Sequence, residues 1–239
     1  MKPHRSALAS IVLLMTVACT ARSQEATNAT TPSQAASFGS VPDPTLDDGE
    51  VVVEPGTYRI PASAWSVADF TVTFPDGWTA KYGHVYAKHI DSAEDELDFY
   101  AVVVDAIYAD PCEGSDTGEL VEVGPSVEDL AAALLEQPGP NASGPFETTL
   151  GGYPATRIDL TFPEGFDLKP CNLAGIGLQI WYSPPADKYF VLVRDATASV
   201  YIVDVDGKRQ VFLTQYLSAT SGADLRELQT ILDSIHIEP

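Results

Sequence analysis

The sequence predicts an α+β fold in which a mainly antiparallel β-sheet carries two amphipathic helices packed on it. Short runs of β-branched and aromatic residues recur throughout residues 50–239, and turn pairs that contain glycine separate several of them. Only two stretches carry leucine and isoleucine at helical spacing. Strands that tight turns join pair antiparallel. Because no repeat and no linker composition interrupts residues 50–239, we expect a single domain there.

The segment that opens the chain is typical of a bacterial lipoprotein signal peptide. Two basic residues precede an apolar run over residues 6–17, which is shorter than the roughly 18 residues of a spanning helix. Thr16-Val17-Ala18 then stands directly before Cys19 and resembles a lipobox, in which the chain is cut before a diacylated cysteine. A leucine is more usual at the place of Thr16. We therefore predict a lipoprotein signal peptide over residues 1–18 and acylation of Cys19 by palmitate-type chains.

This leader predicts an extracytoplasmic protein that a lipid anchors to the cell membrane. Two acyl chains are enough for stable anchoring. Residues 19–49 are rich in Ala, Thr, Ser, Gln and Pro, and such a composition buries too little apolar surface to fold, so we predict a disordered tether there. The alternative is an ordinary secretory peptide cleaved near Ala18 or Ala21, which would leave the protein secreted.

The chain is strongly acidic. Asp and Glu together number 34 against 13 for Lys and Arg, which gives a formal net charge of −21. A surface of this charge repels nucleic acid and anionic lipid headgroups, so we expect no nucleic-acid partner. The acids are dispersed along the chain rather than grouped in blocks, and their simplest interpretation is a solvated surface.

Two cysteines remain once Cys19 is assigned to the anchor. Cys112 and Cys171 both lie in turn-rich loops that contain proline. In an oxidising space two such cysteines are expected to pair, and a disulfide of this loop length contributes on the order of 4 kcal/mol in chain-entropy estimates. A metal site or a redox pair is the alternative, but neither a CxxC motif nor a nearby histidine supports it.

The first half of the domain is predicted to be β-rich. Residues 51–53 and 57–60 flank a Pro-Gly turn and predict two short strands. Residues 69–74 alternate between apolar and threonine side chains, which is typical of a half-buried strand, and the turn Pro75-Asp76-Gly77 ends it before Trp78. Residues 97–109 predict one long strand, part of it buried on both faces.

A helix and a hairpin follow. Ser126 with an acid three residues later has the form of a capping box, Leu130 and Leu134 form an apolar stripe, and Pro138-Gly139 ends the predicted helix. Beyond it, Gly151-Gly152 lies between two β-prone runs, residues 146–150 and 153–160, and predicts a hairpin turn.

The last part of the domain is predicted to hold four more strands and the second helix. The strands cover residues 177–182, 189–195, 199–205 and 210–217, with Asp206-Gly207 as a hairpin turn between the last two. Leucine and isoleucine at helical spacing from residue 225 to 235 predict an amphipathic helix. Residues 233–237 then leave it as a short edge strand.

Candidate metal ligands are few. His84 and His89 are five residues apart, which suits neither one helix face nor one strand face, and zinc draws three or four nitrogen or sulfur ligands. Asp204-Val205-Asp206-Gly207 lacks the glycine and the final acid of a calcium loop. The densest acid cluster, Glu94-Asp95-Glu96 with Asp98, suits either weak calcium binding or a solvated loop. We predict no metal site and no cofactor.

No motif for catalysis stands out. The chain has no GxSxG, no Walker motif and no dinucleotide-binding glycine pattern. A glycosidase needs two acids, and nothing in the sequence selects a pair among 34. The remaining lead is a set of aromatic residues at predicted strand ends and loops, where they would line a ligand groove or pack in the core. This possible ligand groove consists of Trp65, Trp78, Trp181, Tyr182 and Tyr189.

Three segments resemble a group of uncharacterised secreted or lipid-anchored proteins of actinobacteria. They are residues 56–59, residues 70–78 with their Pro-x-Gly-Trp turn, and Leu232-Asp233-Ser234-Ile235 near the end. The order of elements over residues 55–237 is also similar to the α/β sandwich of PsbP and Mog1-like proteins. These motifs are structural, so no functional residue is carried over. The resemblance implies a binding or accessory domain rather than an enzyme.

The sequence therefore predicts a lipid-anchored, extracytoplasmic binding or accessory protein of the cell envelope. Its partner would be an envelope protein or a small ligand, besides the membrane that holds the anchor. The alternative is a hydrolase of envelope polymers that uses a pair of acids. A cleft with two acids, one of them with a raised pKa, would favour the hydrolase.

Overall fold

The structure of the chain is a computed structural model, which describes residues 39–40, 50–81, 84–90, 92–114, 118–183 and 188–238. The predicted signal peptide, Cys19 and most of the predicted tether lie outside the described residues. Among the residues that the structure describes, no helix has the length and hydropathy needed to cross a membrane.

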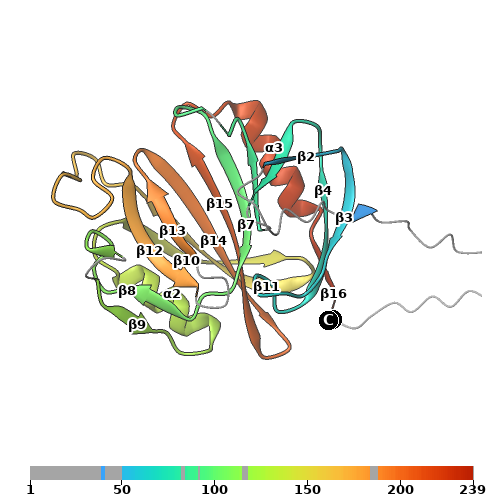
Figure 1. The fold of residues 1–239 in the computed structure, drawn as a ribbon. Coiled ribbons are helices and arrows are strands. Elements are labelled where there is room, and N and C mark those ends of the chain that lie inside the picture. The colour runs from blue at the N-terminus through green and yellow to red at the C-terminus, as the bar shows by residue number, and fades with distance from the viewer. Residues whose placement is uncertain are drawn as a thin grey trace, which may run out of the picture. The chain divides into compact units, whose positions relative to one another are not determined.

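An eight-stranded antiparallel sheet forms the centre of the domain (Figure 1). Each of its strands pairs antiparallel with its neighbours. In spatial order the strands are β10 (Asn141–Leu150), β11 (Tyr153–Thr161), β14 (Ala196–Val205), β15 (Lys208–Leu217), β7 (Leu97–Val102), β6 (Val85–Lys88), β5 (Trp78–Lys81) and β2 (Val51–Val53).

A smaller sheet lies against each face of the central sheet. One contains β1 (Gly39–Ser40), β3 (Gly56–Ile60), β4 (Asp69–Phe74) and β16 (His236–Glu238), and the other contains β13 (Lys188–Val193), β12 (Gly177–Ser183), β8 (Ala106–Tyr108) and β9 (Leu120–Glu122). Alternate residues of β14 belong to two separate cores: Tyr201 and Val203 pack with β4, whereas Val200 packs with β12. The class is mostly antiparallel β with two helices, as predicted, but the single predicted sheet is wrong. Both faces of β14 and β15 are apolar, so both must be covered.

The two predicted helices are confirmed. α2 (Val127–Glu136) begins with the predicted capping box, in which Ser126 Oγ accepts from Asp129 N and the Asp129 carboxylate accepts from Ser126 N. α3 (Gly222–Asp233) begins at the N-cap Ser221. Each helix buries one apolar stripe, α2 in the core with β12 and α3 in the core with β4. The chain then leaves α3 as the predicted edge strand, β16, which pairs with β4.

Both predicted hairpins are present. Gly151-Gly152 joins β10 to β11, and Asp206-Gly207 joins β14 to β15. Gly151 has φ 61°, and a Cβ there would lie 2.5 Å from Cγ1 of Ile237, so glycine is required both by the turn and by the close packing of β16. β10 begins at Asn141, five residues before the predicted start, with an irregular register between Ser143 and Phe146.

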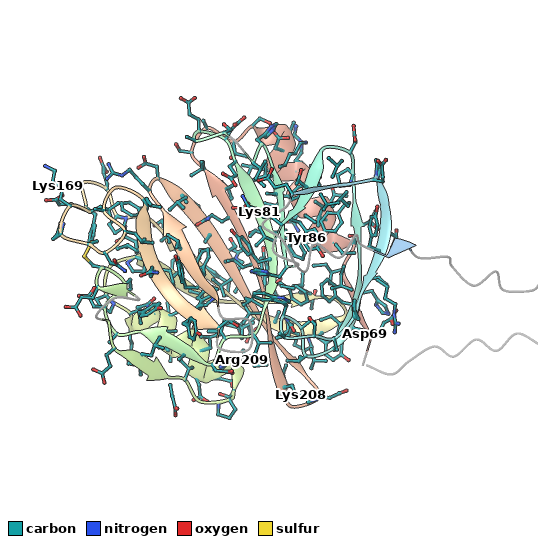
Figure 2. All side chains as sticks on the ribbon, viewed as in Figure 1. Asp69, Lys81, Tyr86, Lys169, Lys208 and Arg209 are labelled. Carbon is teal, nitrogen blue, oxygen red and sulfur yellow. A yellow bond between two sulfur atoms is a disulfide. The ribbon has the colours of Figure 1, made fainter. Side chains whose placement is uncertain are left out.

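The long strand predicted over residues 97–109 is wrong, because the chain divides there into β7 and β8, which belong to different sheets. Of the three backbone carbonyls between them, those of Val103 and Val104 accept from side chains, whereas that of Asp105 accepts from the backbone N of Val123 at 2.9 Å. Ser183 Oγ donates to Val103 O at 2.7 Å, and the buried Arg209, labelled in Figure 2, donates to Val104 O. Side-chain donors at these positions let the strand end while its backbone stays hydrogen-bonded.

Cys112 and Cys171 form a disulfide with an S–S distance of 2.08 Å (Figure 2). It joins the loop after β8 to the loop before β12. Backbone hydrogen bonds strengthen the same junction, since Asn172 N donates to Cys112 O at 2.8 Å and Gln179 N donates to Pro111 O at 2.9 Å. The disulfide therefore joins two loops that flank strands β8 and β12 of the same four-stranded sheet.

Candidate functional site

A cleft of about 480 Å³ lies between β13 and the part of the central sheet formed by β5, β6, β7 and β15. We name it the Asp98 cleft after the acid on its floor. On β7, Leu97 and Phe99 belong to the core beneath α3, so the alternate residues Asp98 and Tyr100 face the other side and line the cleft. Strand alternation thus places both polar side chains on the face of β7 that lines the cleft, where further polar residues from neighbouring strands join them. Its lining comprises Lys81, His84, Val85, Ala87, Ile90, Glu96, Asp98, Tyr100, Tyr189, Phe190, Val191, Val193, Gln215 and Leu217.

Asp98 is a buried acid of the cleft with a strongly raised pKa. It is 6% exposed, and its carboxylate accepts hydrogen bonds from Tyr100 and from Gln215, the residue opposite it on β15. Burial, and after it the negative charge of Glu96, raises the pKa of Asp98 to about 7. The two hydrogen bonds and the positive charge of Lys81 act in the opposite direction but do not cancel burial. At neutral pH this carboxyl group is therefore partly protonated and partly ionised.

The hydrogen-bond donors to Asp98 are held in place. Burial raises the pKa of Tyr100 well above its ordinary value, with a further contribution from the charge of Asp98, so the phenol stays protonated and can donate. Oε1 of Gln215 accepts from the backbone N of Val193 at 3.3 Å. This hydrogen bond also holds β13 against the central sheet. The Gln215 amide therefore supports the wall that β13 forms and, through its bond to Asp98, the floor of the cleft.

One end of the cleft is an aromatic stack. The ring of His84 lies 3.3 Å from that of Trp65, centroid to centroid, with 4° between their planes. Gln210 secures the Trp65 loop, since its Oε1 accepts from Val67 N at 2.8 Å and its Nε2 donates to Val102 O at 3.1 Å. His84 is buried and lines the cleft, while Trp65 supports it from behind.

The structure does not bring the five aromatic residues of the predicted groove together. Trp78 is fully buried in one core, and its indole N–H donates to Glu227 at 2.7 Å. Trp181 is buried in the other core, with its ring 4.6 Å from that of Phe190. Tyr182 pairs with Tyr189 across β12 and β13. Of the five, Tyr189 lines the Asp98 cleft, and Trp65 reaches it through His84.

The acid cluster at residues 94–98 is divided by the structure. Glu94 and Asp95 belong to the loop before β7, whereas Glu96 and Asp98 both line the cleft. Glu96 and Asp98 are two positions apart on an extended chain, so their Cα atoms are about 7 Å apart. The sequence predicted either weak calcium binding or a solvated loop for the whole cluster. The signal that could have separated Asp98 was its place inside a strongly apolar strand, where a charged residue needs a specific reason.

The residues considered as metal ligands do not converge. Within the described part of the chain, no group of three or more His, Cys, Asp or Glu side chains is arranged to hold a metal ion. His89 Nε2 lies 3.6 Å from Asp224 Oδ2, and His236 lies on β16. In the Asp206 turn, Gly207 N donates to Asp204 Oδ1 at 2.6 Å, which is the bond of a hairpin turn.

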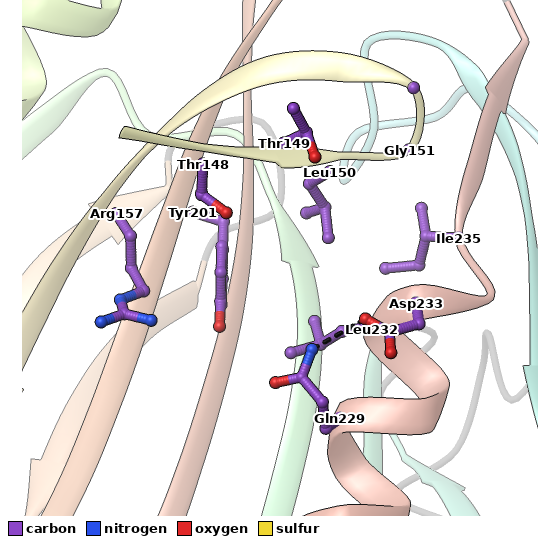
Figure 3. A pocket seen from close by; sticks show the side chains of 11 residues that line it. Thr148, Thr149, Leu150, Gly151, Arg157, Tyr201, Gln229, Leu232, Asp233 and Ile235 are labelled. Carbon is purple, nitrogen blue, oxygen red and sulfur yellow. Dashed lines mark hydrogen bonds between the residues drawn. The ribbon is translucent and has the colours of Figure 1, made fainter. Parts of the chain in front are cut away.

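A second pocket, of about 400 Å³, lies between the β10–β11 turn and the end of α3 (Figure 3). Arg157, Tyr201, Gln229 and Asp233 point into it. Gln229 Nε2 donates to Asp233 Oδ1 at 2.8 Å, whereas Arg157 Nε lies 3.1 Å from Asp159 Oδ1 but is buried without a hydrogen-bond partner. Apolar side chains contribute less to this lining than to that of the Asp98 cleft.

Comparisons with known proteins find distant structural neighbours but no match in sequence. No protein-family model matches the chain, and no curated protein matches it in sequence. Among solved structures it is similar to LpqN, described as involved in cell envelope biogenesis of Mycobacterium tuberculosis, with 14% identity, a TM-score of 0.38, and coverage of 80% of this chain and 91% of LpqN. It is also similar to the cyanobacterial PsbP protein of Synechocystis, with 12% identity, a TM-score of 0.35, and coverage of 82% and 99%. Because TM-scores below 0.5 do not establish function, the function must be argued from this chain's own residues.

Proposed function

We propose that the protein is a lipid-anchored, extracytoplasmic binding or accessory protein that takes up a small ligand in the Asp98 cleft. The observation that supports this most is the lining of the cleft, where aliphatic and aromatic side chains surround a few polar groups on a rigid sheet floor. Pockets of this size and mixed lining are typical of ligand sites. The leader and the disulfide support an extracytoplasmic location. The PsbP and Mog1-like sandwich stays a prediction.

The polar side chains on the floor of the cleft are held in place before any ligand binds. Asp98, Tyr100 and Gln215 lie on neighbouring strands of the central sheet, and their hydrogen bonds exist without a ligand. A ligand would therefore not have to order them, which lowers the entropic cost of binding.

A neutral fluorophore tests this function directly. N-phenyl-1-naphthylamine brightens in apolar surroundings, and we expect it to bind the full chain that carries Cys19→Ser, in which no attached lipid competes for the cleft. Val85→Phe should abolish most of the signal, because Val85 lines the cleft and faces away from both cores. Val121→Phe is the matched control, since Val121 is an exposed strand valine on β9. Equal signals from both variants would contradict the proposal.

A hydrolase of envelope polymers is the second candidate, and one observation favours it. Glu96 and Asp98 share the cleft, and the pKa of Asp98 is raised to about 7, as a general acid requires. This function predicts that the protein releases reducing ends from purified peptidoglycan, and that Glu96→Gln and Asp98→Asn each abolish the release. Polymer left uncut by the wild type would rule it out for that substrate and leave the binding function in place.

A further inference from the structure

The Asp98 cleft carries more negative than positive charge. Glu96 and Asp98 line it, and Lys81 is the only Lys or Arg among its described lining residues. Nζ of Lys81 lies 3.0 Å from Oε1 of Glu50, so part of its positive charge is used by an acid outside the lining. On the carboxyl group of Asp98, the negative charge of Glu96 acts more strongly than the positive charge of Lys81.

The same carboxylate is otherwise well prepared for a positive group. Tyr100 and Gln215 already donate hydrogen bonds to it. Burial and the like charge of Glu96 still disfavour the ionised form of Asp98. A cation placed beside Asp98 would offset both effects, because opposite charges attract strongly where water is scarce.

The rest of the cleft suits an apolar group. Its walls include Val85, Ile90, Phe190 and Leu217, which come from four different parts of the chain. At roughly 30 Å³ for a group the size of water, the volume of about 480 Å³ has room for roughly sixteen such groups. A ligand of this size can place an apolar group against these walls and one polar end at the floor.

We propose that the cleft binds an amphipathic amine, with the protonated nitrogen against the carboxylate of Asp98 and the apolar part against the wall that Phe190 and Leu217 help to form. This proposal rests on the proposed binding function, because it assigns a ligand class to the same cleft. No covalent step is involved. The ammonium group gains a charge-assisted hydrogen bond, and Asp98 gains a positive charge in direct contact.

Three decyl compounds that differ only in their polar end test the proposal. Decylamine, decanol and decanoate, each below its micelle concentration, compete with N-phenyl-1-naphthylamine for the full chain with Cys19→Ser. At about pH 8 we expect decylamine to displace the fluorophore at a concentration about tenfold or more below that of decanol, as a charge-assisted hydrogen bond allows. Decanoate should compete least, because Glu96 and Asp98 repel it.

Two controls separate the cleft from the acidic surface of the chain. Asp98→Asn should reduce the preference for decylamine over decanol to a few-fold. Glu94→Gln removes one charge from an exposed position in the loop before β7 and should leave this preference unchanged. Ethylamine should not compete, because it lacks the apolar part.

A change of pH repeats the test without any substitution. Besides Asp98, the titratable groups around the cleft are Glu96 beside it, Lys81 from β5, His84, Tyr100 from β7 and Tyr189 from β13. At about pH 5.5 the preference for decylamine should shrink in the wild type, since Asp98 then holds its proton, and Asp98→Asn should change little between the two pH values.

The possible outcomes distinguish the amine proposal from the proposed binding function. Equal competition by decylamine and decanol, or a preference that survives Asp98→Asn, would overturn the amine proposal while the bound fluorophore still supports the cleft as a binding site. A chain that does not bind the fluorophore at all, while folded, would overturn the proposed function and the amine proposal together.

Discussion

Replacement of Asp98 by asparagine should stabilise the protein, and the gain should grow with pH. The pKa of Asp98 rises from 3.8 to about 7 on folding. Between these two values the unfolded chain has already lost the proton that the folded chain still holds, so a rise in pH favours unfolding. At 1.36 kcal/mol for each pKa unit, ionisation of Asp98 lowers the free energy of unfolding by about 4 kcal/mol above pH 7.

Asparagine removes this cost and keeps the shape of the side chain. Its carbonyl oxygen still accepts a hydrogen bond from Tyr100 or Gln215. We therefore expect Asp98→Asn and the wild type to be similarly stable near pH 4, and the variant to gain on the order of 4 kcal/mol by pH 8. Water or a cation that enters the cleft would reduce the gain, because either would favour the ionised carboxylate in the folded wild type.

Urea unfolding of the oxidised protein at several pH values from about 4 to 8 measures this difference. Glu94→Gln controls for the loss of one negative charge at an exposed position. A free-energy difference between Asp98→Asn and the wild type that does not change with pH would refute the reasoning. So would a variant that becomes less stable than the wild type as pH rises.

Four further predictions follow from other parts of the molecule. A clickable fatty acid should label the wild type and not Cys19→Ala; equal labelling would refute the lipid anchor. Serine at both Cys112 and Cys171 should lower the free energy of unfolding by about 4 kcal/mol in urea, the chain-entropy value for a disulfide that spans 59 residues; unchanged stability would contradict it. Arg209→Leu should cost roughly 3 kcal/mol in the same assay, because three backbone carbonyls lose their donor; a cost near zero would show that water replaces the guanidinium. Gly151→Ala should destabilise by about 1–3 kcal/mol more than its neighbour's replacement, Gly152→Ala, because both have positive φ but only the first Cβ would clash, with a side chain of β16; equal effects would contradict this.

The parts of the fold that local chemistry determines could be predicted from the sequence. The capping box at Ser126 specifies the start of α2, and the positive φ angles at Asp206 and Gly207 are what the predicted hairpin turn requires. The short edge strand β16 after α3 was likewise predicted from the residues of its own segment. These features depend on residues that are neighbours in the chain.

Features that depend on distant residues were not predictable. Directly after the end of β7, Ser183 and Arg209 donate to the carbonyls of Val103 and Val104 from other strands. The predicted aromatic groove failed to assemble for a similar reason, because Trp78 on β5 and Trp181 on β12 lie in different sheets and pack in two different cores. Asp98 was visible as one of four clustered acids, but its burial depends on β13, which lies about ninety residues further along the chain.

The titration of Asp98 itself tests the proposed amine site most directly. Its carboxyl carbon can be followed by NMR in ¹³C-labelled chain that carries Cys19→Ser, first alone and then with saturating decylamine. We predict a midpoint near pH 7 without the amine and a midpoint clearly below 7 with it, because the ammonium group favours the ionised carboxylate. A midpoint that stays near 7 while decylamine fills the cleft would contradict the contact between the amine and Asp98.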